Sequence, residues 1–242
     1  MIELVDVSKK LGDRQILSGM TFSLDKGETY VLMGPSGVGK SVTLQHIIGL
    51  MTPDSGTVKI DGQSIPDLNR KGLMAMRKRM GYLFQNGALI NWLTVLENVA
   101  LPLSENTNGK QSQIRDRAME VLELVSMTHA ADDYPASISG GMKLRTGLAR
   151  ALVTEPEVVL YDEPNAGLDP IISDQIHNLI IEVRDKIGVA GLVVTHSRAC
   201  ALTVADRIGV IADGKIGEEG TVDEMRASDN PLVRDFLGGG AD

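Results

Sequence analysis

Short apolar runs alternate with helical patterns along most of the chain, and together they predict an α/β fold. Strand-like runs lie at 2–7, 20–24, 30–33, 57–60 and 80–84, and later at 158–161, 192–195 and 208–211. Helical spacing is found at 42–48, 67–79 and 173–186. This alternation is typical of a parallel sheet covered by helices, in which ligands gather where the strands end.

Between residues 94 and 152 the strand signal fades and helical patterns replace it. We therefore expect one domain over 1–242, with 1–88 and 154–242 forming the sheet core and 89–153 forming an inserted helical subdomain. The polar stretch 104–111 and the glycine run 238–240 are expected to be a loop and a frayed end.

The segment between the apolar run at 30–33 and the following helix carries a complete phosphate-loop motif. It reads Gly34-Pro35-Ser36-Gly37-Val38-Gly39-Lys40-Ser41, which fits G-x-x-x-x-G-K-[ST]. The glycines let backbone N–H groups converge on phosphate oxygens at a helix N-terminus. Lys40 can reach the outer phosphates, and the Ser41 hydroxyl can ligate Mg²⁺. A turn that merely joins a strand to a helix needs neither side chain, so the motif predicts binding of a nucleoside triphosphate.

Polar residues follow other strand-like runs. Asp162 and Glu163 come directly after 158–161, where Mg²⁺ would compensate a buried acid and Glu163 could polarise a water for attack on the γ-phosphate. The alternative for this pair is a set of turn acids that cap the next helix near Pro170. Gln85 ends another run and offers an amide oxygen to Mg²⁺ or to the attacking water, and His196 ends a third, where it could meet the γ-phosphate.

Composition excludes several classes of function. Twenty-four basic against 32 acidic residues give a net charge of −8, which argues against broad capture of nucleic acid. The basic cluster at 70–79 is more often a solvated helix face than a polyanion site.

No apolar run approaches the roughly 20 residues of a membrane span, and the N-terminus begins with a strand pattern rather than a targeting peptide. We expect a cytosolic protein whose membrane attachment comes from a partner.

One more segment identifies a family. Ile138-Ser139-Gly140-Gly141-Met142-Lys143, with Arg145 and Leu148-Ala149-Arg150-Ala151-Leu152, resembles the signature motif of ATP-binding-cassette (ABC) ATPases. The phosphate loop, Gln85, Asp162-Glu163, Ala166-Gly167-Leu168-Asp169 and His196 complete that family's motifs in the right order. The resemblance spans essentially the whole chain.

The resemblance implies a P-loop NTPase fold with a mixed or parallel RecA-like sheet, N-terminal antiparallel strands and an inserted helical subdomain. It implies ATP and Mg²⁺ as cofactors, with Lys40, Gln85, Glu163 and His196 acting in catalysis and Ser41, Gln85 and Asp162 near the metal. It also implies a head-to-tail homodimer in which Ser139-Gly140-Gly141 of one copy closes over the ATP of the other. Asp169 would lie at that interface and couple the two ATP sites.

Three positions depart from the family pattern. The resemblance places Leu11, Ile16 and Val42 at the nucleotide. Leu11 stands where many relatives carry an aromatic ring that stacks on adenine, so stacking on the base is expected to be weaker here. Val42 replaces a hydroxyl residue that contacts the α-phosphate, and Met142 replaces a glutamine. None of these changes removes Lys40 or Glu163, so we expect an active ATPase.

The segments 77–89, 95–103 and 233–238 are similar to ATPases of bacterial phospholipid transport systems of the mammalian-cell-entry (MCE, or Mla) kind. This similarity implies a membrane permease that docks in a groove around Gln85–Leu101, lined by Leu89, Ile90, Trp92 and Leu93. It further implies an MCE-domain lipid-binding protein beyond the permease, a small cytosolic accessory protein, and a location on the cytoplasmic face of a bacterial inner membrane.

Three alternatives stay open. One is the ATPase of another membrane-coupled ABC system, such as an amino-acid importer or a lipoprotein-release system. A second is a regulatory scaffold that binds ATP without turnover, as a cell-division ABC protein largely does, although the intact Glu163 and His196 argue against it. Another is a soluble ABC ATPase of DNA repair, which would carry coiled-coil or zinc insertions and a basic surface. The sequence shows neither of those features.

Overall fold

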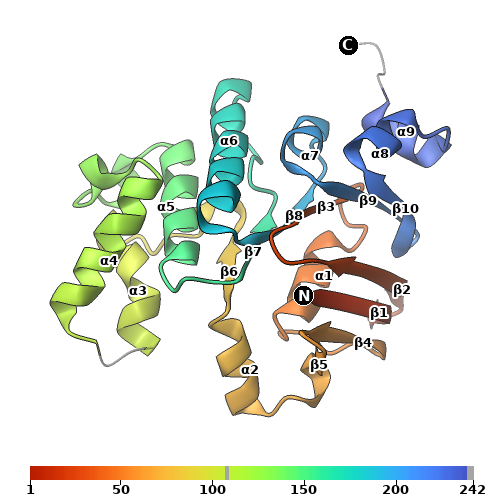
Figure 1. Ribbon diagram of the computed structural model, residues 1–242, viewed down its shortest axis with the longest axis horizontal. Coiled ribbons are helices and arrows are strands. Elements are labelled where there is room, and N and C mark those ends of the chain that lie inside the picture. The colour runs from red at the N-terminus through yellow and green to blue at the C-terminus, as the bar shows by residue number, and fades with distance from the viewer. Residues whose placement is uncertain (107–108, 239–242) are drawn as a thin grey trace. The chain divides into compact units, whose positions relative to one another are not determined.

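Figure 1 shows the computed structural model of the protein, in which residues 1–106 and 109–238 are described. They form two compact units. The terminal unit comprises Met1–Arg77 and Ala190–Asp242, and the central unit comprises Lys78–Val189. The chain is α/β, as the alternating pattern predicted.

The terminal unit contains an antiparallel sheet and a mixed sheet. Its strands are β1 (Ile2–Leu11), β2 (Arg14–Leu24), β3 (Thr29–Met33), β4 (Ser55–Ile60), β5 (Gln63–Ser64), β8 (Ala190–Thr195), β9 (Arg207–Ala212) and β10 (Lys215–Thr221). Its helices are α1 (Lys40–Ile47), α2 (Arg70–Arg77), α7 (Arg198–Val204), α8 (Val222–Ala227) and α9 (Pro231–Leu237). The antiparallel sheet has the order β2-β1-β4-β5, and in the mixed sheet β3 pairs in parallel with both β8 and β9 while β10 is antiparallel to β9.

The central strands of the mixed sheet are buried along their whole length. Every residue of β3 and β8 is buried, which matches their continuous apolar sequences. Parallel strands covered on both faces read as uninterrupted Val, Ile and Leu runs, so these were the easiest strands to predict.

An aromatic and charged cluster holds β2, β3, β9 and β10 together within the terminal unit. The rings of Phe22 and Tyr30 stack with centroids 5.0 Å apart, and the Arg207 guanidinium lies 5.2 Å from the centre of the Tyr30 ring. The buried Tyr30 hydroxyl donates to Glu219 at 2.7 Å, and Arg207 pairs with Glu28 and Glu219. Burial and Glu219 raise the pKa of Tyr30, so this phenol stays protonated and remains a donor.

The central unit combines a pair of parallel strands with a group of helices. Its elements are β6 (Met80–Leu83), α3 (Val95–Asn106), α4 (Gln111–Leu124), α5 (Gly140–Leu152), β7 (Val158–Asp162) and α6 (Pro170–Ile187). In Figure 1, α3, α4 and α5 pack against one another, and α6 packs beside α5. The predicted helical stretch after residue 94 is therefore confirmed.

Several local predictions need correction. β1 and β2 are longer than the expected runs, because their exposed faces carry polar residues that hide the strands in the sequence. β10 was missed, since it is a polar strand containing two glutamates. α3 continues to Asn106, so the loop expected from residue 104 begins later. Residues 107–108 of that loop and 239–240 of the expected tail lie outside the described residues.

The basic cluster at 70–79 is only partly a solvated face. Arg77 donates to the carbonyl oxygens of Ile48 and Gly49 just after α1, and Arg79 forms an ion pair with Glu157 at 2.6 Å. These arginines therefore have structural partners within their own units.

The compact units do not follow the boundaries at 88 and 154 that the sequence led us to expect. β6, β7 and α6 group with the helices of the central unit. The division into a sheet core and a helical subdomain remains a prediction. Among the helices of residues 1–106 and 109–238, none has both the length and the apolar character needed to cross a bilayer.

Candidate functional site

The phosphate loop of the terminal unit lies where the sequence placed it, between the end of β3 and the start of α1. Gly39 is the residue before the helix and has a φ of +118°, and Gly37 has a φ of +77°. Lys40 is only 6% exposed, and its ammonium donates to the carbonyl oxygens of Gly34 at 2.8 Å and Pro35 at 3.2 Å. No side chain caps α1 and no acidic residue lies in its first turn, so its N-terminus keeps the positive character that suits a phosphate.

His196 shares the strand edge with this loop. β3 and β8 are parallel, with Met33 opposite Thr195. The phosphate loop follows β3 and His196 follows β8, so both begin at the same edge of the sheet. His196 is exposed, and Ser197 caps α7 by accepting from the Cys200 N–H at 3.3 Å. The structure thus brings together these two predicted elements of the terminal unit.

Of the residues expected near the adenine base, one lies against the phosphate loop and the others do not line the cavity beside it. Ile16 packs against the loop, because a methyl group built on Gly39 would lie 3.3 Å from Ile16 Cγ2. A cavity of about 370 Å³ adjoins the loop and is lined by Arg14, Gln15, Ile16, Ser18, Gly37, Val38, Asp213 and Gly214. Leu11 is exposed beside the Gly12-Asp13 turn and does not line this cavity, and Val42 is half-buried in the first turn of α1. Arg14 and Asp213 were missed, because exposed charges in hairpins carry no motif.

The acids of the central unit lie beside Gln85. β6 and β7 are parallel with Leu83 opposite Tyr161, so the residues that follow each strand emerge at one edge. Asp162 accepts a hydrogen bond from the Tyr82 hydroxyl at 3.1 Å, and burial together with the Asp162 charge raises the pKa of Tyr82. Glu163 has a φ of +48°, a left-handed conformation that is uncommon for glutamate. Neither acid is a helix cap; the cap of α6 is Asp169, which accepts from the Ile172 N–H at 3.0 Å.

The exposed Gln85 leads into a tight turn that the C-terminal half of α5 holds in place. Arg150 donates to the carbonyl oxygens of Gly87 at 2.7 Å and Ala88 at 2.9 Å. Asn86, Gly87 and Ala88 all have positive φ, so the turn depends on these contacts. Sequence reasoning found Gln85 and the arginine-containing motif but missed their connection, since 62 positions separate Arg150 from Ala88.

The signature turn forms the start of α5. Ser139 caps the helix by accepting from the Met142 N–H at 3.3 Å, and Gly140 is exposed in the first turn. Gly141 is buried against α6, because a methyl group on it would lie 2.6 Å from Ile172 Cγ2. Helix starts of this kind present backbone N–H donors, which is the chemistry a phosphate requires.

In the segment Gln85–Leu101, which is expected to contact a permease, the tryptophan side chain is exposed to solvent. Trp92 is 79% exposed, which confirms the exposure expected of this region. The buried Asn98 holds the segment by accepting from the Ile90 N–H and by donating to the carbonyl oxygens of Ile90, Leu93 and Thr94. Leu89, Ile90 and Leu93 are half-buried, so part of their surface serves the core.

The predicted metal ligands have the right chemistry for Mg²⁺. Ser41 offers a hydroxyl, Gln85 an amide oxygen and Asp162 a carboxylate, and Mg²⁺ prefers such oxygen donors together with substrate phosphates. Among the residues that the structure describes, no group of three or more His, Cys, Asp or Glu side chains could hold a metal alone.

Comparison with known proteins gives concordant results. The family described as "ABC transporter" matches residues 17–166. The chain is 41% identical over 238 residues to the "Probable ribonucleotide transport ATP-binding protein mkl" of Mycobacterium leprae, covering 98% of this chain and 69% of that protein. It is 39% identical to the "Intermembrane phospholipid transport system ATP-binding protein MlaF" of Escherichia coli K12, covering 100% of this chain and 90% of that protein. The chain thus spans about two thirds of the mycobacterial relatives, 66% in Mycobacterium tuberculosis.

A solved structure agrees with these relatives. The structure titled "Dimeric structure of a post-hydrolysis state of the ATP-binding cassette MJ0796 bound to ADP and Pi" superposes with a TM-score of 0.83 at 34% identity, covering 92% of this chain and 99% of that chain. Family match, relatives and fold all agree with the order of motifs, and the chain belongs to the ABC transporter family as one of its ATP-binding cassettes.

Proposed function

We propose that this chain is the ATP-hydrolysing subunit of a membrane transporter that moves phospholipid through a permease of the MCE/Mla kind. The observation that carries the phospholipid assignment is the match to MlaF, which extends over the whole chain and nine tenths of that relative. The mycobacterial relatives are slightly more identical, but a third of their length has no counterpart here. Transport of ribonucleotides is therefore the second candidate.

Each motif residue has a role in this proposal. The phosphate loop binds the triphosphate, and Lys40 leaves its carbonyl partners to meet the outer phosphates. Bound Mg²⁺, held by Ser41, Gln85 and Asp162, would neutralise charge that develops on the phosphate oxygens. Glu163 accepts a proton from the attacking water, and His196 contacts the γ-phosphate.

The working unit is a homodimer. Ser139, Gly140 and Gly141 of one copy would donate backbone N–H groups to the nucleotide held by the other copy, so ATP stabilises the closed dimer and hydrolysis releases it. The exposed positions of Ser139, Gly140 and Asp169 support this role, as does the dimeric cassette bound to ADP and Pi.

The permease docks at the segment Gln85–Leu101, where Trp92 offers an exposed ring on a loop held by Asn98. Closure of the dimer would move this surface and drive the permease. In this arrangement the chain lies on the cytoplasmic face of a bacterial inner membrane, with an MCE-domain lipid-binding protein beyond the permease and a small cytosolic accessory protein beside the ATPase.

The catalytic assignment is tested with Glu163→Gln. Because the amide cannot accept the water's proton, turnover should fall by about 100-fold or more while ATP binding persists. Phosphate release measures turnover, and size-exclusion chromatography with Mg-ATP should show a trapped dimer. Glu182→Gln, an exposed change on α6, is the control and should leave both unchanged. Wild-type turnover in Glu163→Gln would remove the proton-acceptor role.

The substrate is tested on the complex purified from membranes with its permease. Mass spectrometry of the bound molecules, followed by ATP-dependent movement of labelled phospholipid between vesicles, should identify phospholipid. Bound ribonucleotide would instead favour the second candidate, and an amino acid or lipoprotein would assign the chain to another ABC system.

A further inference from the structure

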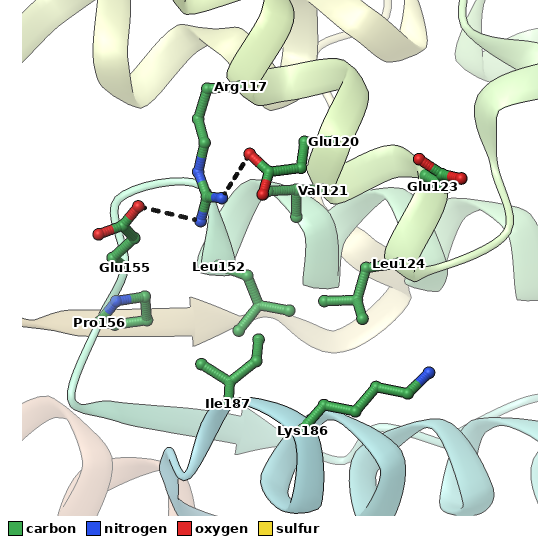
Figure 2. Close-up of a pocket in the computed structure, with 10 residues that line it drawn as sticks. All are labelled: Arg117, Glu120, Val121, Glu123, Leu124, Leu152, Glu155, Pro156, Lys186 and Ile187. Atoms are coloured by element: carbon green, nitrogen blue, oxygen red, sulfur yellow. Dashed lines mark hydrogen bonds and ion pairs between the residues drawn. The ribbon is translucent and has the colours of Figure 1, made fainter.

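The central unit contains a pocket of about 720 Å³ that includes none of the residues assigned above to nucleotide, metal or catalysis. The ends of α4, α5 and α6 and the loop after α5 surround it, as Figure 2 shows. Its lining residues are Arg117, Glu120, Val121, Glu123, Leu124, Leu152, Glu155, Pro156, Lys186 and Ile187. The volume falls within the range of pockets that bind ligands or partner side chains.

The floor of the pocket is apolar. Leu124, Leu152 and Ile187 point toward one another in Figure 2, and the buried Pro156 lines the same pocket. Ile187 is 45% exposed at the last position of α6, although an isoleucine gains nothing from contact with water. Apolar surface of this kind inside a concave pocket is typical of a binding site.

The rim presents carboxylates to the outside. Arg117 hydrogen bonds to Glu120 at 2.8 Å and pairs with Glu155 at 3.4 Å, and it also donates to the Val153 carbonyl oxygen. The Arg117 side chain is 27% exposed, whereas Glu120 is 67% and Glu155 is 76% exposed. The cation therefore lies beneath the carboxylates that it links, and an approaching molecule meets the carboxylates first.

The rim also carries one lysine and one further carboxylate. Lys186 is paired with Glu182, one turn earlier on α6, at 3.5 Å. Glu123 is exposed on α4 and adds a third carboxylate to the lining. The lining therefore has three carboxylates against two cations, and both cations are paired with carboxylates. This net negative charge around an apolar centre is complementary to a partner with a basic rim.

We infer that this pocket binds a basic amphipathic segment of a partner protein, which places one apolar side chain on Leu124, Leu152 and Ile187 and flanking lysines or arginines beside Glu120, Glu123 and Glu155. A helix with apolar residues three and four positions apart and basic residues on either side has this pattern. The inference does not depend on the proposed ATPase activity, because the pocket contains none of the residues assigned to nucleotide, metal or catalysis; Leu152, at the end of the segment that follows the signature turn, is an apolar lining residue.

The test uses the full chain with labelled methyl groups and a synthetic helical peptide of about 14 residues made of leucine and lysine in amphipathic order. In NMR spectra, the methyls of Leu124, Leu152 and Ile187 should shift on titration, and high salt should weaken binding. A scrambled peptide and a leucine–glutamate peptide should bind at least about tenfold more weakly.

Matched variants locate the binding. Ile187→Asp and Glu123→Lys should each weaken the leucine–lysine peptide at least about tenfold, while Ile171→Asp, at an exposed isoleucine on the same helix, should have no effect. Glu123→Lys should improve binding of the leucine–glutamate peptide. Equal affinity for wild type and Ile187→Asp, or shifts confined to the methyls near Trp92, would overturn the inference. Phosphate release should stay at the wild-type rate in Ile187→Asp, whichever peptide result is found.

Discussion

The terminal and central units each carry a glycine-rich turn at the start of a helix, but the glycines serve different physical needs. In the phosphate loop, Gly37 and Gly39 have φ values of +77° and +118° that other residues rarely adopt. In the signature turn, Gly140 and Gly141 have no positive φ, and Gly141 is required because Ile172 of α6 lies so close. The first turn therefore depends on backbone torsion and the second on packing between helices.

The two units also differ in how far along the chain the hydrogen-bond partners of their site residues lie. In the terminal unit, the Lys40 ammonium donates to backbone carbonyl oxygens only five and six residues away. In the central unit, Asp162 is held by Tyr82 and the turn after Gln85 is held by Arg150, both of which are distant in sequence.

The largest effect should come from Gly39→Ala in the phosphate loop. The new methyl group would lie 2.8 Å from Leu17 Cδ2 in a backbone conformation unsuited to alanine, and we expect the free energy of unfolding to fall by about 3 kcal/mol. ATP binding should be lost as well. Chemical denaturation and calorimetric titration measure the two effects.

Gly37→Ala is the matched control for that loop. No atom lies within 4 Å of the position of the new methyl group, so only the torsional cost of a φ of +77° remains; we expect about 1 kcal/mol. If both variants lost the same stability, the contact of Gly39 with Leu17 and Ile16 would be unimportant.

An intermediate effect should distinguish the glycines of the signature turn. In Gly141→Ala the methyl group would meet Ile172 Cγ2 at 2.6 Å, and the free energy of unfolding should fall by about 1–2 kcal/mol. In Gly140→Ala the nearest atom is Leu168 Cδ2 at 3.4 Å, an ordinary contact, so stability should be preserved. Turnover should fall in both variants, because both alter the turn proposed to contact ATP across the dimer. Equal stability of the two variants would show that α6 relaxes around residue 141.

The smallest effect should be a gain in nucleotide affinity in Leu11→Tyr. A ring at this exposed position could stack on adenine, which we expect to contribute about 1 kcal/mol, or roughly fivefold in the dissociation constant for ATP. Val5→Tyr, at another exposed position of β1, is the control and should leave affinity unchanged. No gain in Leu11→Tyr would mean that the base lies elsewhere, for example toward the cavity lined by Gln15 and Asp213.

Much of the fold was predictable because its strongest signals are local. The buried strands β3, β7 and β8 are continuous apolar runs. The glycines before Lys40 are a local signal for the turn between β3 and α1. The polar strand β10 and the short helices α7, α8 and α9 were not predicted, since they depend on packing against the rest of the terminal unit rather than on their own patterns.

The sequence by itself determined which residues are available for phosphate, metal and proton chemistry, because the spacing from Gly34 to Ser41 and the acids after the run at 158–161 are local properties of the chain. Only the tertiary structure decided that Tyr82 donates to Asp162, that Arg150 holds the turn after Gln85, and that Gly141 must be small. The acidic pocket beside Ile187 was likewise not visible in the sequence. The physical reason is the same in each case: these contacts join residues far apart along the chain, and only close packing of the folded elements brings them within reach.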